Sequence, residues 1–168
     1  MDFACAETPG LFIVDGGSLE NVTVRNISVG AGIITPICIR YGNRSARVGE
    51  GASWMKDILI ENVFTSKVLA PEEIGTHSRA HYPLIWVEGP VDVGNLTVRN
   101  FVRDEHMLPV ATIRIDKPAT VRHLTVRDWR MVNRLDEPLT FIDRRGKVEK
   151  LTLENNDFTA APGEWTGR

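Results

Sequence analysis

The sequence lacks a strong charge of either sign. Twenty lysine and arginine residues stand against 22 aspartate and glutamate residues in a chain of 168, for a formal net charge of −2. No basic run occurs either, so the charge pattern favours neither nucleic acid nor a membrane surface as a partner. An uncharged or weakly charged partner fits this balance better.

Cysteine is scarce. Cys5 and Cys38 are the two cysteines, and they lie 33 residues apart with no metal-ligand spacing around them. They are compatible with one disulfide bond or with two buried thiols, and we expect thiols. The sequence therefore predicts no cysteine metal site, and no cofactor is expected.

Long apolar runs are absent as well. No stretch approaches the ~20 apolar residues of a membrane span, and Met1 to Gly10 lacks the charged start and apolar core of a signal peptide. Two localisations remain open. The protein stays inside the cell, or it is extracellular or periplasmic and its signal peptide was removed.

What is present suffices for a folded domain. With 42% hydrophobic residues among 168, the chain can bury a sizeable core. We expect a single domain spanning residues 1–168, either alone or as part of a larger protein.

A five-residue pattern recurs five times along the chain. Its first and third positions are aliphatic, its fourth is charged and its fifth is Asn or Asp, as in a half-buried strand followed by a turn. The spacings between copies are 36, 38, 28 and 27 residues. The copies are Val22-Thr23-Val24-Arg25-Asn26, Ile58-Leu59-Ile60-Glu61-Asn62, Leu96-Thr97-Val98-Arg99-Asn100, Leu124-Thr125-Val126-Arg127-Asp128 and Leu151-Thr152-Leu153-Glu154-Asn155.

A second short strand is expected before each copy. These strands lie at residues 11–15, 37–41, 84–88, 112–116 and 140–143. No helical apolar period separates the strands, and the turn dipeptides of antiparallel hairpins are missing. The pattern therefore predicts an all-β solenoid in which equivalent strands of successive units pair in parallel, ~4.8 Å apart.

The solenoid geometry assigns a place to each repeated position. The aliphatic residues stack inside as ladders, and the Asn or Asp residues mark one corner. Asn tolerates the left-handed backbone conformation that a sharp corner requires, and its side chain can bond the backbone of the next unit. The aromatic residues after the corner are expected inside the turn: Phe64, Phe101, Trp129 and Phe158.

Two segments carry a family resemblance: Ile37-Cys38-Ile39-Arg40-Tyr41-Gly42 and Met55-Lys56-Asp57-Ile58-Leu59-Ile60-Glu61-Asn62-Val63. They resemble the late coils of the pectin-lyase-like superfamily, most closely the second half of glycoside hydrolase family 28, the polygalacturonases and rhamnogalacturonases. The resemblance covers most of the chain and implies a right-handed parallel β-helix of about five coils. Such strand patterns recur across lyases, hydrolases, epimerases and tailspikes, so they specify a fold rather than a reaction.

The catalytic motifs of family 28 are missing. That family uses an Asn-Thr-Asp strand, an Asp-Asp pair, a Gly-His-Gly turn and an Arg-Ile-Lys strand. The nearest segment here is Arg114-Ile115-Asp116-Lys117, which has one residue too many between Ile and Lys. The hydrolytic residues of the family therefore cannot be transferred to this chain.

Strand alternation nonetheless predicts two outward columns on the short strands. This prediction takes the following positions as inward: Phe12, Val14, Ile37, Ile39, Ile85, Val87, Ile113, Ile115 and Ile142. One column would hold Ile13, Cys38, Trp86, Arg114 and Phe141, and the other Asp15, Arg40, Glu88, Asp116 and Asp143.

The second column would place three carboxylates, Glu88, Asp116 and Asp143, on consecutive units. They are the candidate catalytic residues, because carboxyl groups ~5 to 5.5 Å apart suit a retaining glycosidase and crowding raises the pKa of one of them. Alternatively, three carboxylates can hold Ca²⁺ beside an arginine that neutralises a uronate or abstracts its proton. The candidate substrate-binding residues are Arg40, Trp86, Arg114, Phe141, Arg144 and His81.

Other interpretations remain open. The charged residues of this face equally fit weak surface salt bridges. His81 belongs to a long insertion, Lys67 to Pro83, of the kind that often carries function. The chain is thus expected to bind or process a polysaccharide, or else to be a structural module or oligomer subunit. Because neither end looks like a capping helix, we expect another chain or segment to cover at least one end of the solenoid.

Overall fold

The computed structural model describes residues 2–3, 11–14, 18–29, 37–42, 53–65, 83–105, 110–157 and 165–166. Within these ranges the chain is all-β and contains no helix. Thirteen strands form three parallel sheets. The arrangement is consistent with the parallel β-solenoid expected from the repeats.

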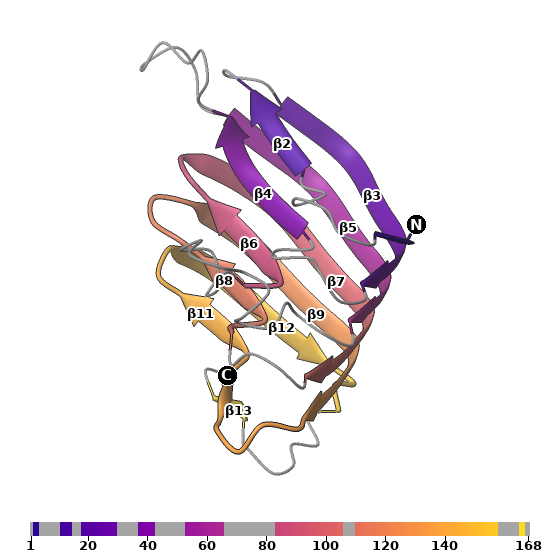
Figure 1. The fold of residues 1–168 in the computed structure, drawn as a ribbon. Helices are drawn as coiled ribbons and strands as arrows, with labels where there is room; N and C mark the ends of the chain where they lie inside the picture. Colours follow the sequence, from indigo (N-terminus) through magenta and orange to yellow (C-terminus); the bar gives the residue numbers. More distant parts are fainter. Residues whose placement is uncertain are drawn as a thin grey trace.

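The largest sheet, called here the long sheet, contains the repeated five-residue pattern. Its order is β1-β3-β5-β7-β9-β12, and every neighbouring pair is parallel. Figure 1 shows its strands running side by side behind a second sheet. Its strands are β1 (Asp2–Phe3), β3 (Ser18–Val29), β5 (Ser53–Thr65), β7 (Val91–Glu105), β9 (Thr120–Asn133) and β12 (Lys147–Glu154).

The second sheet, called here the short sheet, contains the strands that precede each repeat, in the order β11-β8-β6-β4-β2. A separate parallel pair joins β10 (Leu139–Thr140) to β13 (Trp165–Thr166). Each repeat therefore contributes one short and one long strand. The short strands are β2 (Leu11–Val14), β4 (Ile37–Gly42), β6 (Ile85–Glu88), β8 (Ile113–Ile115) and β11 (Ile142–Arg144).

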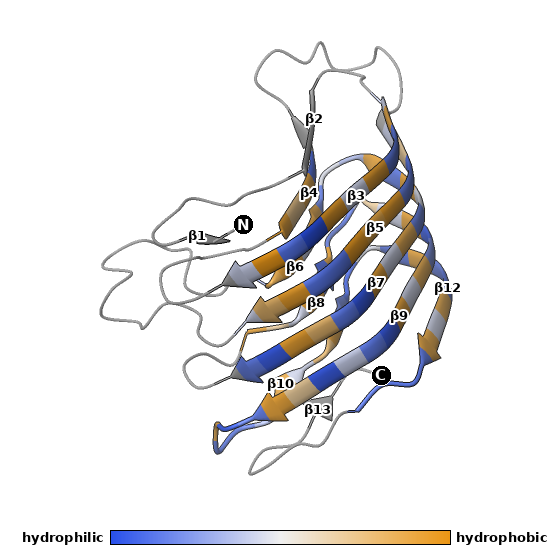
Figure 2. Cartoon of the chain, turned by 90° about the vertical axis from the view of Figure 1, so that its right-hand side faces the viewer, coloured by the Kyte–Doolittle hydropathy of each residue, from blue (hydrophilic) through white to orange (hydrophobic). Residues whose placement is uncertain are grey.

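The five copies of the repeat are in register, as the pattern predicted. Leu96 pairs with Ile58 on one side and with Leu124 on the other, and Leu124 pairs in turn with Leu151. The ladder residues of β5, β7 and β9 are at most 1% exposed. Figure 2 shows the resulting alternation of hydrophobic and hydrophilic bands along these strands. Leu153 differs, with 38% of its surface exposed, because β12 is the edge strand.

All five corner residues have the left-handed backbone conformation that the sequence predicted. Hydrogen bonds join neighbouring corner side chains: Asn62 donates to Asn26 at 3.1 Å, Asn100 to Asn62 at 2.6 Å and Asn155 to Asp128 at 2.7 Å. The strands β3, β5, β7 and β9 continue through their corners, whereas β12 ends at Glu154, just before Asn155. The φ values are 59° at Asn26, 55° at Asn62, 49° at Asn100, 52° at Asp128 and 49° at Asn155.

The aromatic core after the corner is confirmed in part. Phe101 and Trp129 are buried and stacked, with ring centroids 4.1 Å apart. Phe64 is 44% exposed, because Val63 occupies the inward position opposite Phe101 and Phe64 lies one residue further along. Phe158 lies outside the described residues.

The inward residues of the short sheet were predicted correctly for β4, β6 and β8, whose isoleucine and valine side chains are fully buried. In β2 the expected register is wrong by three residues, which also exchanges its inward and outward positions. Leu11 pairs with Ile39 and Phe12 with Arg40, so Ile13 does not join the column of Cys38. The run of four apolar residues in β2 carries no alternation from which its register could be read.

Candidate functional site

The outer face of the short sheet, called here the polar face, carries two rows of side chains. One row contains Cys38, Trp86 and Arg114 on β4, β6 and β8. The other contains Arg40 paired with Glu88, and Asp116 follows β8 directly. These positions agree with the expected columns.

Asp143 departs from its expected position. The register pairs it with Arg114 in the first row, two residues away from the predicted alignment with Asp116. The row of three consecutive carboxylates therefore does not form. The calcium site considered from the sequence required three converging carboxylates, and the described part of the chain contains no group of three His, Cys, Asp or Glu side chains that could hold a metal ion.

Phe141 is not on the surface. It is 1% exposed and lies edge-on to Trp129, with ring centroids 5.4 Å apart. Leu84 and Thr112, which precede β6 and β8 as Phe141 precedes β11, are also fully buried. The residue before each of these short strands thus faces the core, and the expected outward position of Phe141 is wrong.

Ion pairs run along each row of the polar face, and Arg145 joins the two rows. Arg40 Nε lies 3.3 Å from Glu88 Oε1, and Arg114 Nε donates to Asp143 Oδ2 at 3.0 Å. Arg145, which the sequence reasoning did not single out, contacts two carboxylates: its Nε donates to Asp143 at 2.9 Å, and its Nη1 lies 3.8 Å from Asp116. The pairs are partly exposed, so each contributes little to stability by itself.

Trp86 is the half-buried aromatic residue of this face. Its indole Nε1 donates a hydrogen bond of 2.7 Å to Asp116 Oδ2. Asp116 directly follows the neighbouring strand β8. The hydrogen bond therefore ties the ring to the next unit and restrains it against rotation. The polar face therefore holds an oriented indole ring among guanidinium and carboxylate groups.

Two ionisable groups of the face are perturbed. Burial raises the pKa of Glu88, and the nearby charge of Asp116 adds to the rise while Arg40 opposes it. Burial also raises the pKa of the Cys38 thiol to about 12, with Glu88 adding to the effect. Cys38 is a free thiol, and its Sγ lies 4.0 Å from Glu88 Oε1. Since the thiolate is the reactive form, Cys38 has little nucleophilic character near neutral pH.

A cationic hollow adjoins Asp116 where the turns after β8 and β11 meet. Its volume is about 350 Å³, and Gly146 makes the close approach possible, since a Cβ there would lie 2.7 Å from the carbonyl oxygens of Asp116 and Ala119. The hollow was not foreseen, because the sequence does not show that these two turns touch. It is lined by Lys117, Pro118, Ala119, Arg145, Gly146 and Lys147.

The remaining candidates are Arg144 and His81. Arg144 ends β11 and is exposed. His81 and most of its insertion lie outside the described residues, as do Cys5 and Asp15.

Chemically, the polar face offers one carboxyl group that holds its proton more tightly than usual, next to a second carboxyl group on the adjacent strand. It also offers guanidinium groups suited to anions. No helix in the described ranges is long and apolar enough to cross a membrane. Comparison of the chain with protein-family models, with curated proteins and with solved structures gave no match.

Proposed function

We propose that the strands close into a right-handed parallel β-helix of about five coils, related to the pectin-lyase-like proteins, and that its polar face binds an acidic polysaccharide. The observation that carries the proposal is the indole of Trp86, held by Asp116 among guanidinium groups on successive strands. An oriented aromatic ring offers a flat apolar surface to a sugar ring. Strands repeating every ~4.8 Å offer successive groups to a repeating polymer.

Charge supports an acidic ligand. Among the described residues of the polar face, cationic side chains outnumber carboxylates, although the whole chain carries a formal charge of −2. A locally positive surface attracts anions, and the guanidinium fork matches the geometry of a carboxylate. The cations are Arg40, Arg114, Lys117 and Arg145, and the carboxylates are Glu88, Asp116 and Asp143.

The existing ion pairs are compatible with this role. Arg114 is paired with Asp143, and Arg145 with Asp143 and Asp116, so a uronate carboxylate would exchange with protein carboxylates. Such an exchange costs little at a partly exposed site, because exposed ion pairs contribute only about 0 to 1 kcal/mol. Binding therefore requires no rearrangement of the strands.

Titration of oligogalacturonate into the protein by calorimetry tests the proposal. Trp86→Ala and Arg114→Gln are each expected to weaken binding about tenfold. The matched control is Arg134→Gln, which breaks a similar pair with Asp104 on the long sheet and is expected to bind as the wild type does. No binding by the wild type, or equal loss in all three variants, would contradict the proposal.

Hydrolysis of the bound polymer is a second candidate, favoured by the raised pKa of Glu88. A carboxyl group that stays protonated longer can serve as a general acid, with Asp116 as its partner. Measurement of newly formed reducing ends, in the wild type and in Glu88→Gln, Asp116→Asn and Asp143→Asn, separates the two functions. If the wild type binds the polymer but forms no new reducing ends, the protein binds the polymer without hydrolysing it.

The alternative of an interaction module rests on β12. This edge strand of the long sheet exposes Leu153, and Val148 and Leu151 beside it are only partly buried. An unpaired apolar edge favours pairing with another strand, here from a second copy of the chain. Sedimentation over a range of protein concentrations tests this: a mass that rises with concentration supports self-association, and a constant monomer mass rejects it.

A further inference from the structure

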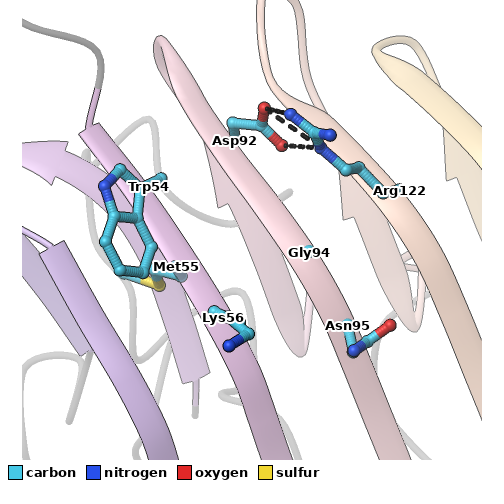
Figure 3. Close-up of a pocket in the computed structure, with 7 residues that line it drawn as sticks. All are labelled: Trp54, Met55, Lys56, Asp92, Gly94, Asn95 and Arg122. Atoms are coloured by element: carbon cyan, nitrogen blue, oxygen red, sulfur yellow. Dashed lines mark hydrogen bonds and ion pairs between the residues drawn. The ribbon is translucent and has the colours of Figure 1, made fainter.

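A second hollow lies on the outer face of the long sheet, away from the polar face. It has a volume of about 370 Å³ and spans the beginnings of β5, β7 and β9. Figure 3 shows its side chains on three adjacent strands. It is lined by Trp54, Met55, Lys56, Asp92, Gly94, Asn95 and Arg122.

Gly94 opens this hollow. It follows Val93, which pairs with Met55 and with Val121, so Gly94 lies in the same row as Lys56 and Arg122. A Cβ at Gly94 would lie 3.5 Å from the Met55 carbonyl oxygen and 3.8 Å from Lys56 Cγ, which are ordinary contact distances. Packing therefore does not require glycine here, and its missing side chain leaves room above the strand.

Trp54 forms one side of the hollow. It is paired in register with Asp92 of β7, and 42% of its surface is exposed. An indole ring buries a large apolar area when a ligand covers it. In Figure 3 the ring of Trp54 and the side chain of Lys56 lie on one side of Gly94, with Arg122 on the other.

The charges around the hollow are compensated in pairs. Arg122 binds Asp92 with two nitrogens, at 2.9 Å and 2.6 Å, and Lys56 Nζ lies 2.7 Å from Glu20. The bond to Arg122 lowers the pKa of Asp92, so this carboxylate stays ionised. The amide of Asn95 is oriented by its donation to Asp57 at 2.6 Å. The hollow thus presents donors and acceptors without an excess of either charge.

We propose that this hollow binds an uncharged pyranose sugar, stacked against Trp54 and lying over Gly94. The ring hydroxyls would bond Asp92, Arg122 and Asn95, whose positions are set by the protein itself. This ligand differs in class from that of the polar face, where cations outnumber carboxylates. The inference is independent of the proposed function, because no residue is shared by the two sites.

Titration with neutral hexasaccharides, cellohexaose, maltohexaose and mannohexaose, tests this inference. The readouts are calorimetry and the indole N–H signal of Trp54 in NMR spectra, assigned by its loss in Trp54→Phe. We expect at least one probe to bind and to shift this signal. Trp54→Ala should then weaken binding about tenfold or more. The matched control is Phe64→Ala, which removes another exposed aromatic ring of β5 and should leave binding unchanged.

Gly94 supplies a second test that does not remove any contact. Gly94→Ala adds only the Cβ for which space exists, and it should keep most of the affinity. Gly94→Val projects further into the hollow and should weaken binding about tenfold, while circular dichroism and the melting temperature report whether the fold is kept. The inference is overturned if no neutral probe binds, if Trp54→Ala or a folded Gly94→Val binds as the wild type does, or if only oligogalacturonate shifts the Trp54 signal.

Discussion

At the residue scale, the corner asparagines show how one side chain serves two purposes. Each adopts a positive φ that most residues reach only at a cost of about 1 to 2 kcal/mol. Each also presents an amide that can donate to one neighbour and accept from another. The ladder from Asn26 through Asn62 to Asn100 uses both properties.

Substitution of Asn100 separates these two contributions. Asn100→Ala loses the ladder bonds and strains the backbone, so we expect it to destabilise the fold by about 2 kcal/mol. Asn100→Gly loses the same bonds but accepts the positive φ, and it should cost about 1 kcal/mol less. Urea denaturation measures both values. Equal losses in the two variants would show that the backbone conformation is not the cause.

Glu88 provides a prediction about pH. Because burial raises its pKa in the folded state, the folded protein holds this proton more tightly than the unfolded chain does. This tighter hold on the proton contributes to stability fully at pH values below the ordinary pKa of Glu. The contribution is lost as pH rises through the raised pKa of Glu88. Glu88→Gln cannot ionise, so its melting temperature should improve relative to the wild type as pH rises above about 4, the ordinary pKa of Glu.

Asp92 is the matched control for Glu88, with the opposite sign. Its pKa is lowered, first by the hydrogen bond from Arg122, so its contribution to stability is present above the ordinary pKa of Asp and is lost as pH falls. Asp92→Asn should therefore become less stable relative to the wild type as pH rises toward the ordinary pKa of Asp, about 4, and the difference should stay constant above it. Thermal unfolding followed by circular dichroism measures both trends. Trends of the same sign would contradict the opposite pKa shifts of Glu88 and Asp92.

At the element scale, the strands of the long sheet are defined by their repeats and those of the short sheet are not. Leu96, Leu124 and Leu151 align because each begins a copy of the same five-residue pattern. Each copy ends at the same corner. The short strands have three to six residues and no such marker. Their alignment depends on the length of the preceding connection, which explains the errors at Phe12 and Asp143.

Trp129 is the element-scale test of the core. It packs between Phe101 and Phe141, which come from different parts of the chain. Trp129→Ala should cost about 3 to 5 kcal/mol, because a large side chain leaves a cavity. Its Nε1 is buried without a hydrogen-bond partner among the described residues, so Trp129→Phe removes an unsatisfied donor and should cost much less. Guanidinium denaturation measures both, and a similar loss in the two variants would contradict this account.

At the scale of the whole molecule, stability should vary along the stack of strands. Among the described strands, β7 and β9 are paired on both sides along most of their length, whereas β12 is paired on one side. Hydrogen exchange should therefore be slowest in β7 and β9 and fastest, among these three, in β12. Protection of β12 that rises with protein concentration would indicate that a second copy pairs with this edge.

The whole molecule also separates two surfaces of different character. The polar face belongs to the short sheet and carries excess cations, whereas the hollow at Gly94 belongs to the long sheet and has compensated charges. Both depend on side chains from successive strands. Neither surface can be assembled from a single repeat.

The sequence by itself determined the repeat, the inward ladders, the corner asparagines and the row of Arg40 and Glu88, because each of these follows from alternation or from a recurring local conformation. Only the tertiary structure decided that Asp143 pairs with Arg114, that Phe141 is buried, and that Arg145 reaches Asp116. Both ion pairs join residues 29 positions apart, and their alignment depends on how the connecting turns pack. Local pattern specifies which way a side chain points, and packing between strands specifies what it meets.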